Sequence, residues 1–309
     1  MKKYSLAIHG GAGTLLKSEF SLEKETEYNK ALQDALARGN KILTADGSAL
    51  DAVEASVKSM EDSPLFNAGF GSVFTNEETH ELEASIMCGK SLQAGAVAGI
   101  RTIKNPISLC KKILKDERFV YLIGKGAERY GQDHDFETVH PEYFSTKFRK
   151  NQLDKAKEDG EKIVLDHNSD RKFGTVGAVA KDQSGNVAAA TSTGGLTNKM
   201  YGRVGDSSVI GSGCFADNNS CAISATGYGE FFLRNVTAHE ISSLMKYRKL
   251  SVLEASEIVV KEQLKEMGGE GGVICVDAKG NLALVFNSEG MYRGWVSDQE
   301  EMQTRIFID

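Results

Sequence analysis

The sequence predicts an α+β fold in which two mainly antiparallel sheets are stacked between layers of helices. Short apolar runs typical of strands occur in both halves of the chain, and each half also contains a pair of segments with helical periodicity. Turn residues join consecutive strands directly, as in antiparallel hairpins. Each sheet needs a second layer over its apolar face, which a helical pair supplies. A doubly wound α/β sheet is the alternative, and the consecutive strands count against it.

One strand and two helices are expected in the N-terminal part. Residues 4–8 form an apolar run typical of a buried strand, which enters a tight glycine-rich loop at 9–13. Apolar residues then recur at helical spacing over 25–43. Ser48 precedes a second helical pattern, and Asp51 follows it three residues later, as in a capping box.

A loop, two strands and a helix complete the first half of the chain. Residues 62–74 have no clear period and indicate a structured loop. Apolar runs at 82–87 and 93–100 predict strands. Pro106 predicts the start of a helix, because proline is favoured in the first helical turn.

A charged segment separates the two halves. Residues 141–174 are rich in Lys, Asp and Glu with little periodicity, which predicts a solvated linker. Two strands follow at 176–180 and 187–191, joined by the hairpin turn signal Asp-Gln-Ser-Gly at 182–185. The remaining elements expected are a strand at 221–225, helices at 230–247 and 252–267, and strands at 273–276, 282–286 and 305–308.

Composition excludes several classes of function. The 309 residues carry a net charge of -6, which argues against a nucleic-acid or acidic-membrane partner. No segment approaches the roughly 18 apolar residues of a membrane span, and no apolar run follows the N-terminal lysines as in a signal peptide. Five cysteines without CxxC spacing favour reduced thiols in a cytoplasmic protein.

A threonine follows the linker at the first position of a buried strand. Gly174-Thr175 leads into Val-Gly-Ala-Val-Ala at 176–180. A threonine hydroxyl needs an adjacent base to act as a nucleophile, and its own α-amine can serve once the preceding peptide bond is cut. That amine has an ordinary pKa of about 7.7–8.0, so much of it is neutral near neutral pH. On these residues alone, a β-branched residue at the start of a strand remains the alternative.

Further motifs accompany this threonine. Thr-Ser-Thr-Gly-Gly at 191–195 lies on the next predicted strand, where a hairpin brings Thr193 close to Thr175. Gly-Arg-Val-Gly-Asp at 202–206 and Thr-Gly-Tyr-Gly-Glu at 226–230 come next. The other motifs are His-Gly-Gly-Ala-Gly at 9–13, Asn-Ala-Gly at 67–69, Gly-Ala-Val-Ala-Gly at 95–99, Phe-Asn at 286–287 and Glu-Gly-Met-Tyr at 289–292.

In this order the motifs resemble the plant-type L-asparaginase/isoaspartyl peptidase (β-aspartyl peptidase) family of N-terminal-nucleophile hydrolases. The resemblance runs essentially from end to end of the chain. It implies a four-layer αββα sandwich and one domain over 1–309. It also implies autocatalytic cleavage between Gly174 and Thr175, which would give an α chain of 1–174 and a β chain of 175–309.

The resemblance implies roles for individual residues. Thr175 is the nucleophile, and Thr193 supports it through a hydrogen bond to the nucleophile or its amine. Asn67 helps to hold the nucleophile side of the site. Arg203 binds the substrate α-carboxylate, for which a planar fork of donors is suited. Asp206 binds the α-ammonium group.

The resemblance also assigns an oxyanion hole, formed by the Thr226 hydroxyl and the Gly227 N–H. Gly229 lines the same pocket. Tyr228 stands where many relatives have a smaller residue, and we expect it to narrow the pocket beside the oxyanion hole. The full set of expected substrate-binding residues is Arg203, Val204, Gly205, Asp206, Thr226, Gly227, Tyr228 and Gly229.

Residues 60–70 resemble the sodium loop of the family. The resemblance implies a structural sodium ion held by backbone oxygens of Met60, Glu61, Ser63, Phe66, Ala68 and Phe70. An ordered connection without an ion is the alternative. No organic cofactor is expected, because the nucleophile is part of the chain.

The activity implied is hydrolysis of L-asparagine to L-aspartate and ammonia, and cleavage of β-aspartyl (isoaspartyl) dipeptides. The resemblance also implies a homodimer of cleaved αβ units, and the cysteines and N-terminus described above favour a cytoplasmic protein. The alternatives are a glycosylasparaginase, a dipeptidase for the β-Asp-Arg units of cyanophycin, and a non-catalytic scaffold that stays uncleaved.

Overall fold

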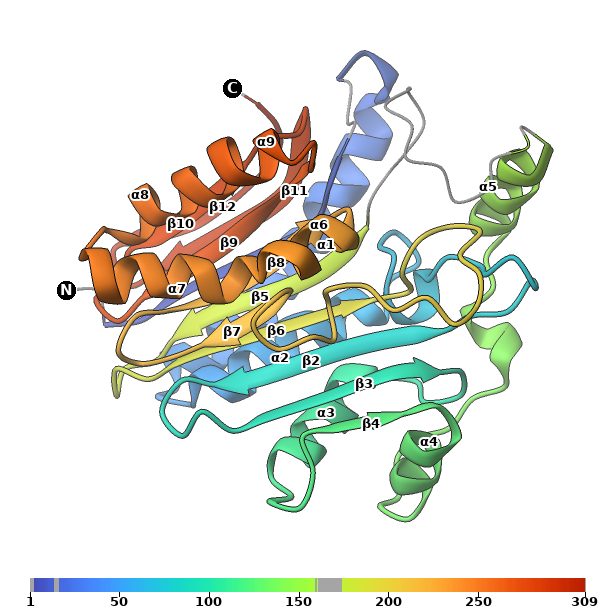
Figure 1. The fold of residues 1–309 in the computed structure, drawn as a ribbon, viewed down its shortest axis with the longest axis horizontal. Helices are drawn as coiled ribbons and strands as arrows, with labels where there is room; N and C mark the ends of the chain where they lie inside the picture. Colours follow the sequence, from blue (N-terminus) through green and yellow to red (C-terminus); the bar gives the residue numbers. More distant parts are fainter. Residues whose placement is uncertain (1–2, 14–16, 159, 161–173, 309) are drawn as a thin grey trace.

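Two sheets stacked face to face form the centre of the molecule (Figure 1). The computed structural model describes residues 3–13, 17–158, 160 and 174–308. The larger sheet has eight strands in the order β12-β11-β1-β5-β6-β2-β3-β4, and the smaller has four in the order β10-β9-β8-β7. Neighbouring strands are antiparallel, apart from the parallel pair β3 and β4. The α+β sandwich expected from the sequence is confirmed.

The strands that build the site come from both sheets. Those of the larger sheet are β1 Ser5–Gly13, β2 Leu82–Cys88, β3 Ala94–Ile100, β4 Tyr121–Ile123, β5 Thr175–Lys181, β6 Val187–Thr193, β11 Gly290–Ser297 and β12 Glu300–Phe307. Those of the smaller sheet are β7 Cys214–Ala216, β8 Cys221–Gly227, β9 Gly271–Asp277 and β10 Leu282–Phe286.

Helices cover the outer face of each sheet and complete the four layers. The larger sheet is covered by α1 Leu22–Thr44, α2 Ala49–Glu61 and α3 Pro106–Leu114, with α4 Gly124–Gln132 beside β3 and β4. The smaller sheet is covered by α6 Gly229–Asn235, α7 Thr237–Arg248, α8 Val252–Glu257, the π-helical stretch Ile258–Gln263 and α9 Leu264–Glu266. Helix α5 Lys147–Glu158 and short 3₁₀ turns at Lys17–Glu19, Gly69–Gly71 and Pro141–Phe144 complete the helical elements described.

Three apolar layers fill the spaces between these four layers. Alternate residues of β1 face opposite sides, so Leu6 and Ile8 contact the helices while Ala7 lies between the two sheets. The third apolar layer joins the smaller sheet to its helices and includes Ile223 and Phe232. Burial on both faces explains why the central strands are apolar along their length.

Two helix starts follow from local chemistry. The Ser48 side chain accepts a hydrogen bond from the Asp51 N–H and so caps α2, as the sequence indicates. Pro106 occupies the first turn of α3, where its missing N–H has no cost.

The glycine-rich segment 9–13 is part of strand β1, so the tight loop expected there is wrong. It pairs with β11 across a bulge between His9 and Gly11, and Gly11 has a φ of 116°. A side chain at Gly10 would collide with the ring of Phe66, because its Cβ would lie 2.4 Å from that ring. The glycines therefore allow a strand to pass close to the 60–70 loop.

The charged segment before Thr175 also differs from the expectation. The structure places the 3₁₀ turn Pro141–Phe144 and helix α5 within the stretch expected as a solvated linker. Phe144 and Leu153 are buried, and Arg149 donates from Nε to the Gly71 carbonyl oxygen over 2.7 Å. This charge-rich segment therefore has one buried side, which its composition does not indicate. Residue 159 and residues 161–173 of the expected linker lie outside the described residues.

Other differences lie away from the site. The helix expected over 230–247 is broken at Val236, which has a φ of 48°, and strands β4 and β11 were not predicted. Within the described residues, we find no helix of sufficient length and apolar character for a transmembrane span.

Candidate active site

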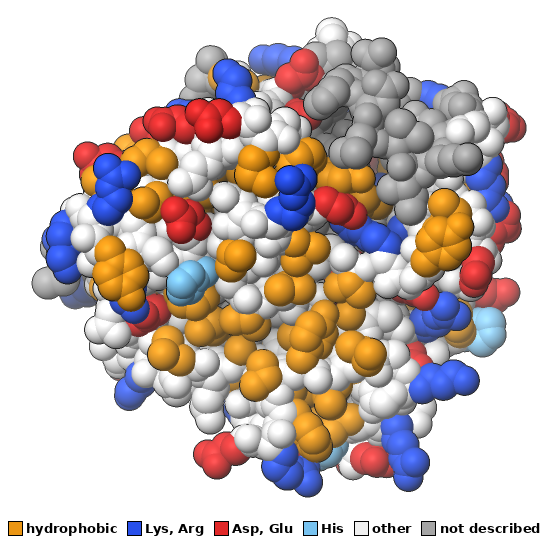
Figure 2. Space-filling model, in the orientation of Figure 1, with side chains coloured by type: hydrophobic (Ala, Val, Ile, Leu, Met, Phe, Trp, Pro, Cys, Tyr) orange, Lys and Arg blue, Asp and Glu red, His pale blue; other side chains and the backbone are white. Residues whose placement is uncertain are grey.

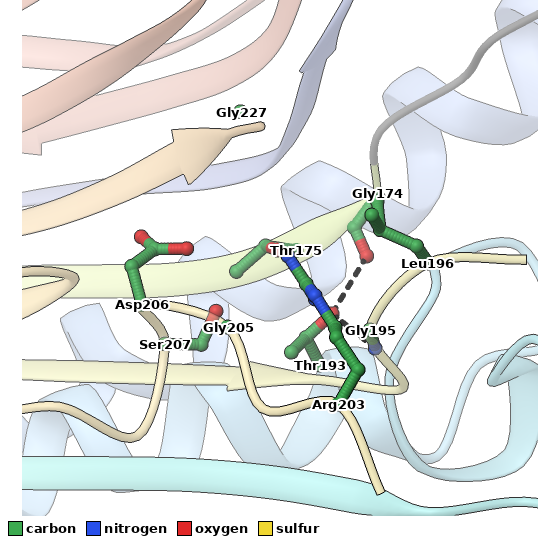
Figure 3. Close-up of a pocket in the computed structure, with 10 residues that line it drawn as sticks. All are labelled: Gly174, Thr175, Thr193, Gly195, Leu196, Arg203, Gly205, Asp206, Ser207 and Gly227. Carbon is green, nitrogen blue, oxygen red and sulfur yellow. Dashed lines mark hydrogen bonds between the residues drawn. The ribbon is translucent and has the colours of Figure 1, made fainter. Parts of the chain in front are cut away.

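The hairpin of β5 and β6 places Thr175 directly opposite Thr193 (Figure 3). A tight turn makes this pairing possible, since the Asp182 N–H bonds to the Asn186 carbonyl and Gly185 has a φ of 85°. Thr175 is the first residue of β5 and is buried. The strands therefore present two threonine side chains side by side at one end of the larger sheet.

Thr193 contacts the peptide group that precedes Thr175. Its hydroxyl donates to the Gly174 carbonyl oxygen over 3.3 Å, and it accepts from the Gly195 N–H over 3.0 Å. The sequence predicts a bond from Thr193 to the nucleophile or its amine, whereas the uncut chain shows this bond to the carbonyl at the expected cleavage site. A donor at that oxygen polarises the carbonyl that the Thr175 hydroxyl would attack.

Asn67 fastens the segment next to these threonines. Its Nδ2 donates to the Gly195 carbonyl over 2.7 Å, and its backbone carbonyl accepts from the Gly194 N–H over 3.1 Å. Gly174 lies against the Asn67 side chain so closely that a Cβ at Gly174 would be 2.6 Å from the Asn67 Cβ. Asn67 thus contacts both the turn after Thr193 and the residue before Thr175.

His9 holds the backbone of Thr175 from the other side. Its Nδ1 lies 3.0 Å from the Thr175 carbonyl oxygen, and its Nε2 lies 2.9 Å from the Ser224 hydroxyl. A carbonyl oxygen only accepts, so Nδ1 carries the proton and Nε2 accepts from Ser224. Burial lowers the pKa of His9 to about 3, so the ring is neutral at neutral pH. The ring links β1 and β5 of the larger sheet to β8 of the smaller sheet.

Arg203 points its guanidinium toward Thr175 (Figure 3). Its Nε and Nη2 donate to the two carboxylate oxygens of Glu230 over 2.9 and 2.8 Å. Burial opposes the charge of Arg203, but the hydrogen bonds and charge of Glu230 outweigh it and hold the pKa of Arg203 above its ordinary value. Glu230 occupies one edge of the guanidinium, which leaves the Nη1 and Nη2 edge for a second carboxylate.

Asp206 is a buried carboxyl group three residues further along the same loop. Its Oδ2 has no hydrogen-bond partner among the described residues. Burial raises the pKa of Asp206 to about 7, against the opposing effect of the Arg203 charge. A Cβ at Gly229 would lie 2.8 Å from both Asp206 Oδ1 and Arg203 Nη2, so only glycine fits between the two charged groups.

Thr226 and Gly227 end strand β8 beside this pocket. The Thr226 hydroxyl accepts from the Ala12 N–H over 3.3 Å, which leaves its proton to donate elsewhere. Ala12 belongs to the glycine-rich part of β1, so that segment places the Thr226 hydroxyl. Tyr228 is not among the described residues that line the pocket, and its ring lies near Phe231 instead. The narrowing expected from Tyr228 stays a prediction.

The residues predicted from motifs far apart in the sequence come together in one pocket. Its lining consists of Gly174, Thr175, Thr193, Gly195, Leu196, Arg203, Gly205, Asp206, Ser207 and Gly227 (Figure 3). Behind this lining lie Thr226, Gly229 and Asn67. Val204 is exposed in the loop that carries Arg203 and Asp206. Gly195, Leu196 and Ser207 were not predicted to line the pocket.

At the loop from Met60 to Phe70, two glycines lie close to backbone carbonyl oxygens. A Cβ at Gly69 would lie 2.3 Å from the Glu61 carbonyl oxygen, and one at Gly71 would lie 2.1 Å from the Phe66 carbonyl oxygen. The glycines thus keep side chains away from these oxygens, and a hard cation prefers such oxygen ligands. Among the described residues no group of His, Cys, Asp or Glu side chains is suited to a metal ion.

Several charged partners were missed from the sequence. In the sequence, Glu230 is recognised only as part of the motif at 226–230. Nothing local in the sequence indicates its ion pair with Arg203. Glu83 and Lys199 form a buried pair beneath residues 202–208, the loop that carries Arg203 and Asp206 and that we call the substrate loop. A charged residue inside the apolar strand at 82–87 is the one signal that could have identified Glu83.

The sandwich, with a threonine at the first position of a central strand directly after a glycine, defines the class of N-terminal-nucleophile hydrolases. The chain belongs to the asparaginase family, whose model matches residues 2–306, and it is a hydrolase. It is 50% identical over 300 residues to an isoaspartyl peptidase of Escherichia coli (strain K12), covering 96% of this chain and 93% of that protein.

Similar proteins also occur in eukaryotes. A putative isoaspartyl peptidase/L-asparaginase of Dictyostelium discoideum is 44% identical over 327 residues, covering 96% of this chain and 94% of that protein. An isoaspartyl peptidase/L-asparaginase of Mus musculus is 39% identical over 286 residues, covering 93% of this chain and 86% of that protein.

Proposed function

We propose that this protein is a self-cleaving amidohydrolase that converts L-asparagine to L-aspartate and ammonia and cleaves β-aspartyl dipeptides. The names of its relatives support these substrates. The observation that carries the proposal is that Thr175, paired with Thr193, lines one pocket with Arg203 and Asp206. A nucleophile, an activated peptide bond and groups for both charges of an amino acid meet in this pocket.

Self-cleavage begins at the Gly174 carbonyl. The Thr175 hydroxyl adds to the carbonyl carbon, while the Thr193 hydroxyl stabilises the charge that develops on the oxygen. The C–N bond breaks and the acyl group moves from nitrogen to oxygen. Water then hydrolyses the ester, which gives a carboxylate at Gly174 and a free hydroxyl and α-amine at Thr175.

Substrate hydrolysis uses the groups that self-cleavage releases. The Thr175 amine takes the hydroxyl proton as the oxygen attacks the side-chain carbonyl of the substrate. The Thr226 hydroxyl and the Gly227 N–H stabilise the oxyanion, and the leaving ammonia or amine receives the proton. An aspartyl ester of Thr175 remains, which water hydrolyses to release aspartate.

Arg203 and Asp206 select the substrate. The free edge of the guanidinium pairs with the α-carboxylate, and the buried Asp206 carboxylate pairs with the α-ammonium group. Both groups belong to the aspartyl residue whose side chain is cleaved. An ordinary α-aspartyl peptide lacks the free α-carboxylate at this position, so it is not a substrate.

The test is hydrolysis by the fully cleaved enzyme of L-asparagine, β-aspartyl-leucine and α-aspartyl-leucine. The first two should be hydrolysed and the third should not. Cleavage of α-aspartyl-leucine alone, or of none, would contradict the proposal. β-Aspartyl-arginine and a glycosylated asparagine in the same assay separate the cyanophycin dipeptidase and glycosylasparaginase activities.

We further propose a structural sodium ion at the loop from Met60 to Phe70. The ion would be held by backbone oxygens of Met60, Glu61, Ser63, Phe66, Ala68 and Phe70, and the glycine contacts described above support two of these ligands, the Glu61 and Phe66 oxygens. The ion would stiffen the loop that carries Asn67. The midpoint of thermal unfolding should then be higher in sodium chloride than in choline chloride of equal ionic strength. Equal midpoints would contradict the ion site.

We also propose a homodimer in the cytoplasm. Hydrophobic side chains gather on the lower central part of the face in Figure 2. Phe119, Val120, Tyr121 and Ile123, at and just before the edge strand β4, are each at least 40% exposed. An apolar sheet edge of this kind favours association. Light scattering coupled to gel filtration tests the dimer, and a monomer mass would contradict it.

The five unpaired cysteines fit a reducing compartment.

A further inference from the structure

A row of three polar residues crosses the larger sheet at the site. Thr175 pairs with Thr193 across β5 and β6, and Thr193 pairs with Glu83 across β6 and β2. Residues directly opposite one another present their side chains on the same face of a sheet. Glu83 therefore lies on the face that carries the nucleophile, two strands away from it.

The Glu83 carboxylate holds the backbone of the substrate loop. It accepts from the Gly205 N–H at both oxygens, over 3.2 and 2.9 Å, and from the Ser208 hydroxyl over 3.3 Å. Gly205 lies between the two residues assigned to the charged groups of the substrate, Arg203 and Asp206. A second attachment comes from the same strand, because the Ser85 hydroxyl donates to the Ser207 carbonyl over 2.6 Å.

Lys199 balances the charge of this carboxylate. Its Nζ lies 3.7 Å from Glu83 Oε1 and donates to the Glu81 carbonyl over 2.8 Å. The side chains of Lys199 and Glu83 are 2% and 1% exposed. Burial lowers the pKa of Lys199, and the charge of Glu83 opposes this effect. Burying two charges costs free energy, and removing one partner leaves the other unpaired.

We propose that Glu83, balanced by Lys199, is a positioning residue that fixes the spacing of Arg203 and Asp206 and thereby selects ligands with both an α-ammonium and an α-carboxylate group. The inference rests on the proposed function. Glu83 does not touch the substrate, and it acts through the Gly205 N–H and the Ser208 hydroxyl. Its loss should therefore weaken ligand binding more than it slows the chemistry at Thr175.

The experiment uses the full chain after self-cleavage, with β-aspartyl-leucine as substrate and L-aspartate and succinate as competitive inhibitors. Succinate lacks the α-amine, so the ratio of the two inhibition constants measures selection for that group. The wild type must first hydrolyse β-aspartyl-leucine, because a failure at this step refutes the proposed function rather than the role of Glu83.

For Glu83→Ala we expect completed self-cleavage and a KM raised about tenfold or more, as for the loss of hydrogen bonds to a charged group. The value of kcat should change much less, and the preference for L-aspartate over succinate should fall. Glu83→Gln with Lys199→Met removes both charges but keeps an acceptor for Gly205, so it should recover most of the KM. Ser85→Ala keeps every charge and should lower the preference in the same direction, which provides a test if Glu83→Ala does not fold.

Asp217→Asn is the matched control, because Asp217 is a buried carboxylate paired with Lys246 at the end of β7. It should lower stability without changing the KM or the inhibitor preference. Glu83→Ala with a wild-type KM and wild-type preference would overturn the proposal. An equal change in Asp217→Asn would also overturn it, since the effect would then reflect general stability.

Discussion

The hydroxyl of Thr193 donates to the carbonyl oxygen of Gly174 over 3.3 Å, across the hairpin from Thr175. This bond places a donor on the carbonyl that must be attacked if the chain cleaves itself. We therefore expect Thr193 to act on self-cleavage directly, as well as on the nucleophile that self-cleavage would produce.

Thr193→Ala should slow self-cleavage by roughly 10²–10³-fold, the loss typical of one oxyanion donor. Thr193→Ser keeps the hydroxyl and should mature at a rate close to that of the wild type. The fraction of uncut chain, followed over time on denaturing gels, measures both rates. Maturation of Thr193→Ala at the wild-type rate would show that the bond to Gly174 has no part in the reaction.

Thr226→Ala should separate the two reactions. The Thr226 hydroxyl bonds to the Ala12 N–H and lies beside Gly227, while Thr193 serves the Gly174 carbonyl. Turnover of β-aspartyl-leucine by the cleaved variant should fall by roughly 10²–10³-fold, with a smaller effect on maturation. Both rates are measured in the same samples. Blocked maturation with full turnover of the cleaved fraction would place the Thr226 hydroxyl on the other reaction.

Gly174→Ala should impair self-cleavage through the contact with Asn67. The new Cβ would lie 2.6 Å from the Asn67 Cβ, so Gly174 or Asn67 must shift, which should disturb the bond from Thr193 to the Gly174 carbonyl. A displacement near 1 Å can lower a rate about 10²-fold. Gly126→Ala is the control, since its Cβ would meet no atom within 4 Å. Wild-type kinetics of maturation in Gly174→Ala would refute the steric argument.

The binding of L-aspartate and of succinate should respond to pH in opposite directions. Asp206 has a pKa raised to about 7. Above this pH it is charged and attracts an α-ammonium group, and below it the neutral carboxyl does not. The inhibition constant of L-aspartate should fall about tenfold between about pH 6 and about pH 8. The inhibition constant of succinate should rise over the same range, because the negatively charged Asp206 carboxylate repels the negatively charged succinate. Parallel pH dependence of the two constants would contradict the role of Asp206.

Local signals account for the parts of the fold that the sequence predicts. The turn at 182–185 and the apolar runs beside it indicate the hairpin of β5 and β6, because register follows from turn geometry. The capping pair Ser48 and Asp51 marks the start of α2 in the same way. Glycines at 10–13 indicate a loop by composition, yet long-range pairing with β11 makes this segment a strand.

The sequence predicts a site residue only where that residue belongs to a motif. Thr175, Arg203 and Asp206 lie in motifs, and the structure brings them into one pocket. Glu83 and Lys199 meet through β2 and the loop after β6, and no periodicity or spacing in the sequence indicates their contact. Contacts of this kind depend on tertiary structure, which a single sequence does not reveal.

The central claim is that Thr175 becomes the N-terminal nucleophile, and intact-protein mass spectrometry after prolonged incubation tests it most directly. The account predicts that the wild-type chain of 309 residues separates into pieces of 174 and 135 residues, the second being 309 minus 174. Thr175→Ala should remain one chain without activity. A wild-type protein that stays whole and still hydrolyses β-aspartyl-leucine would contradict the account.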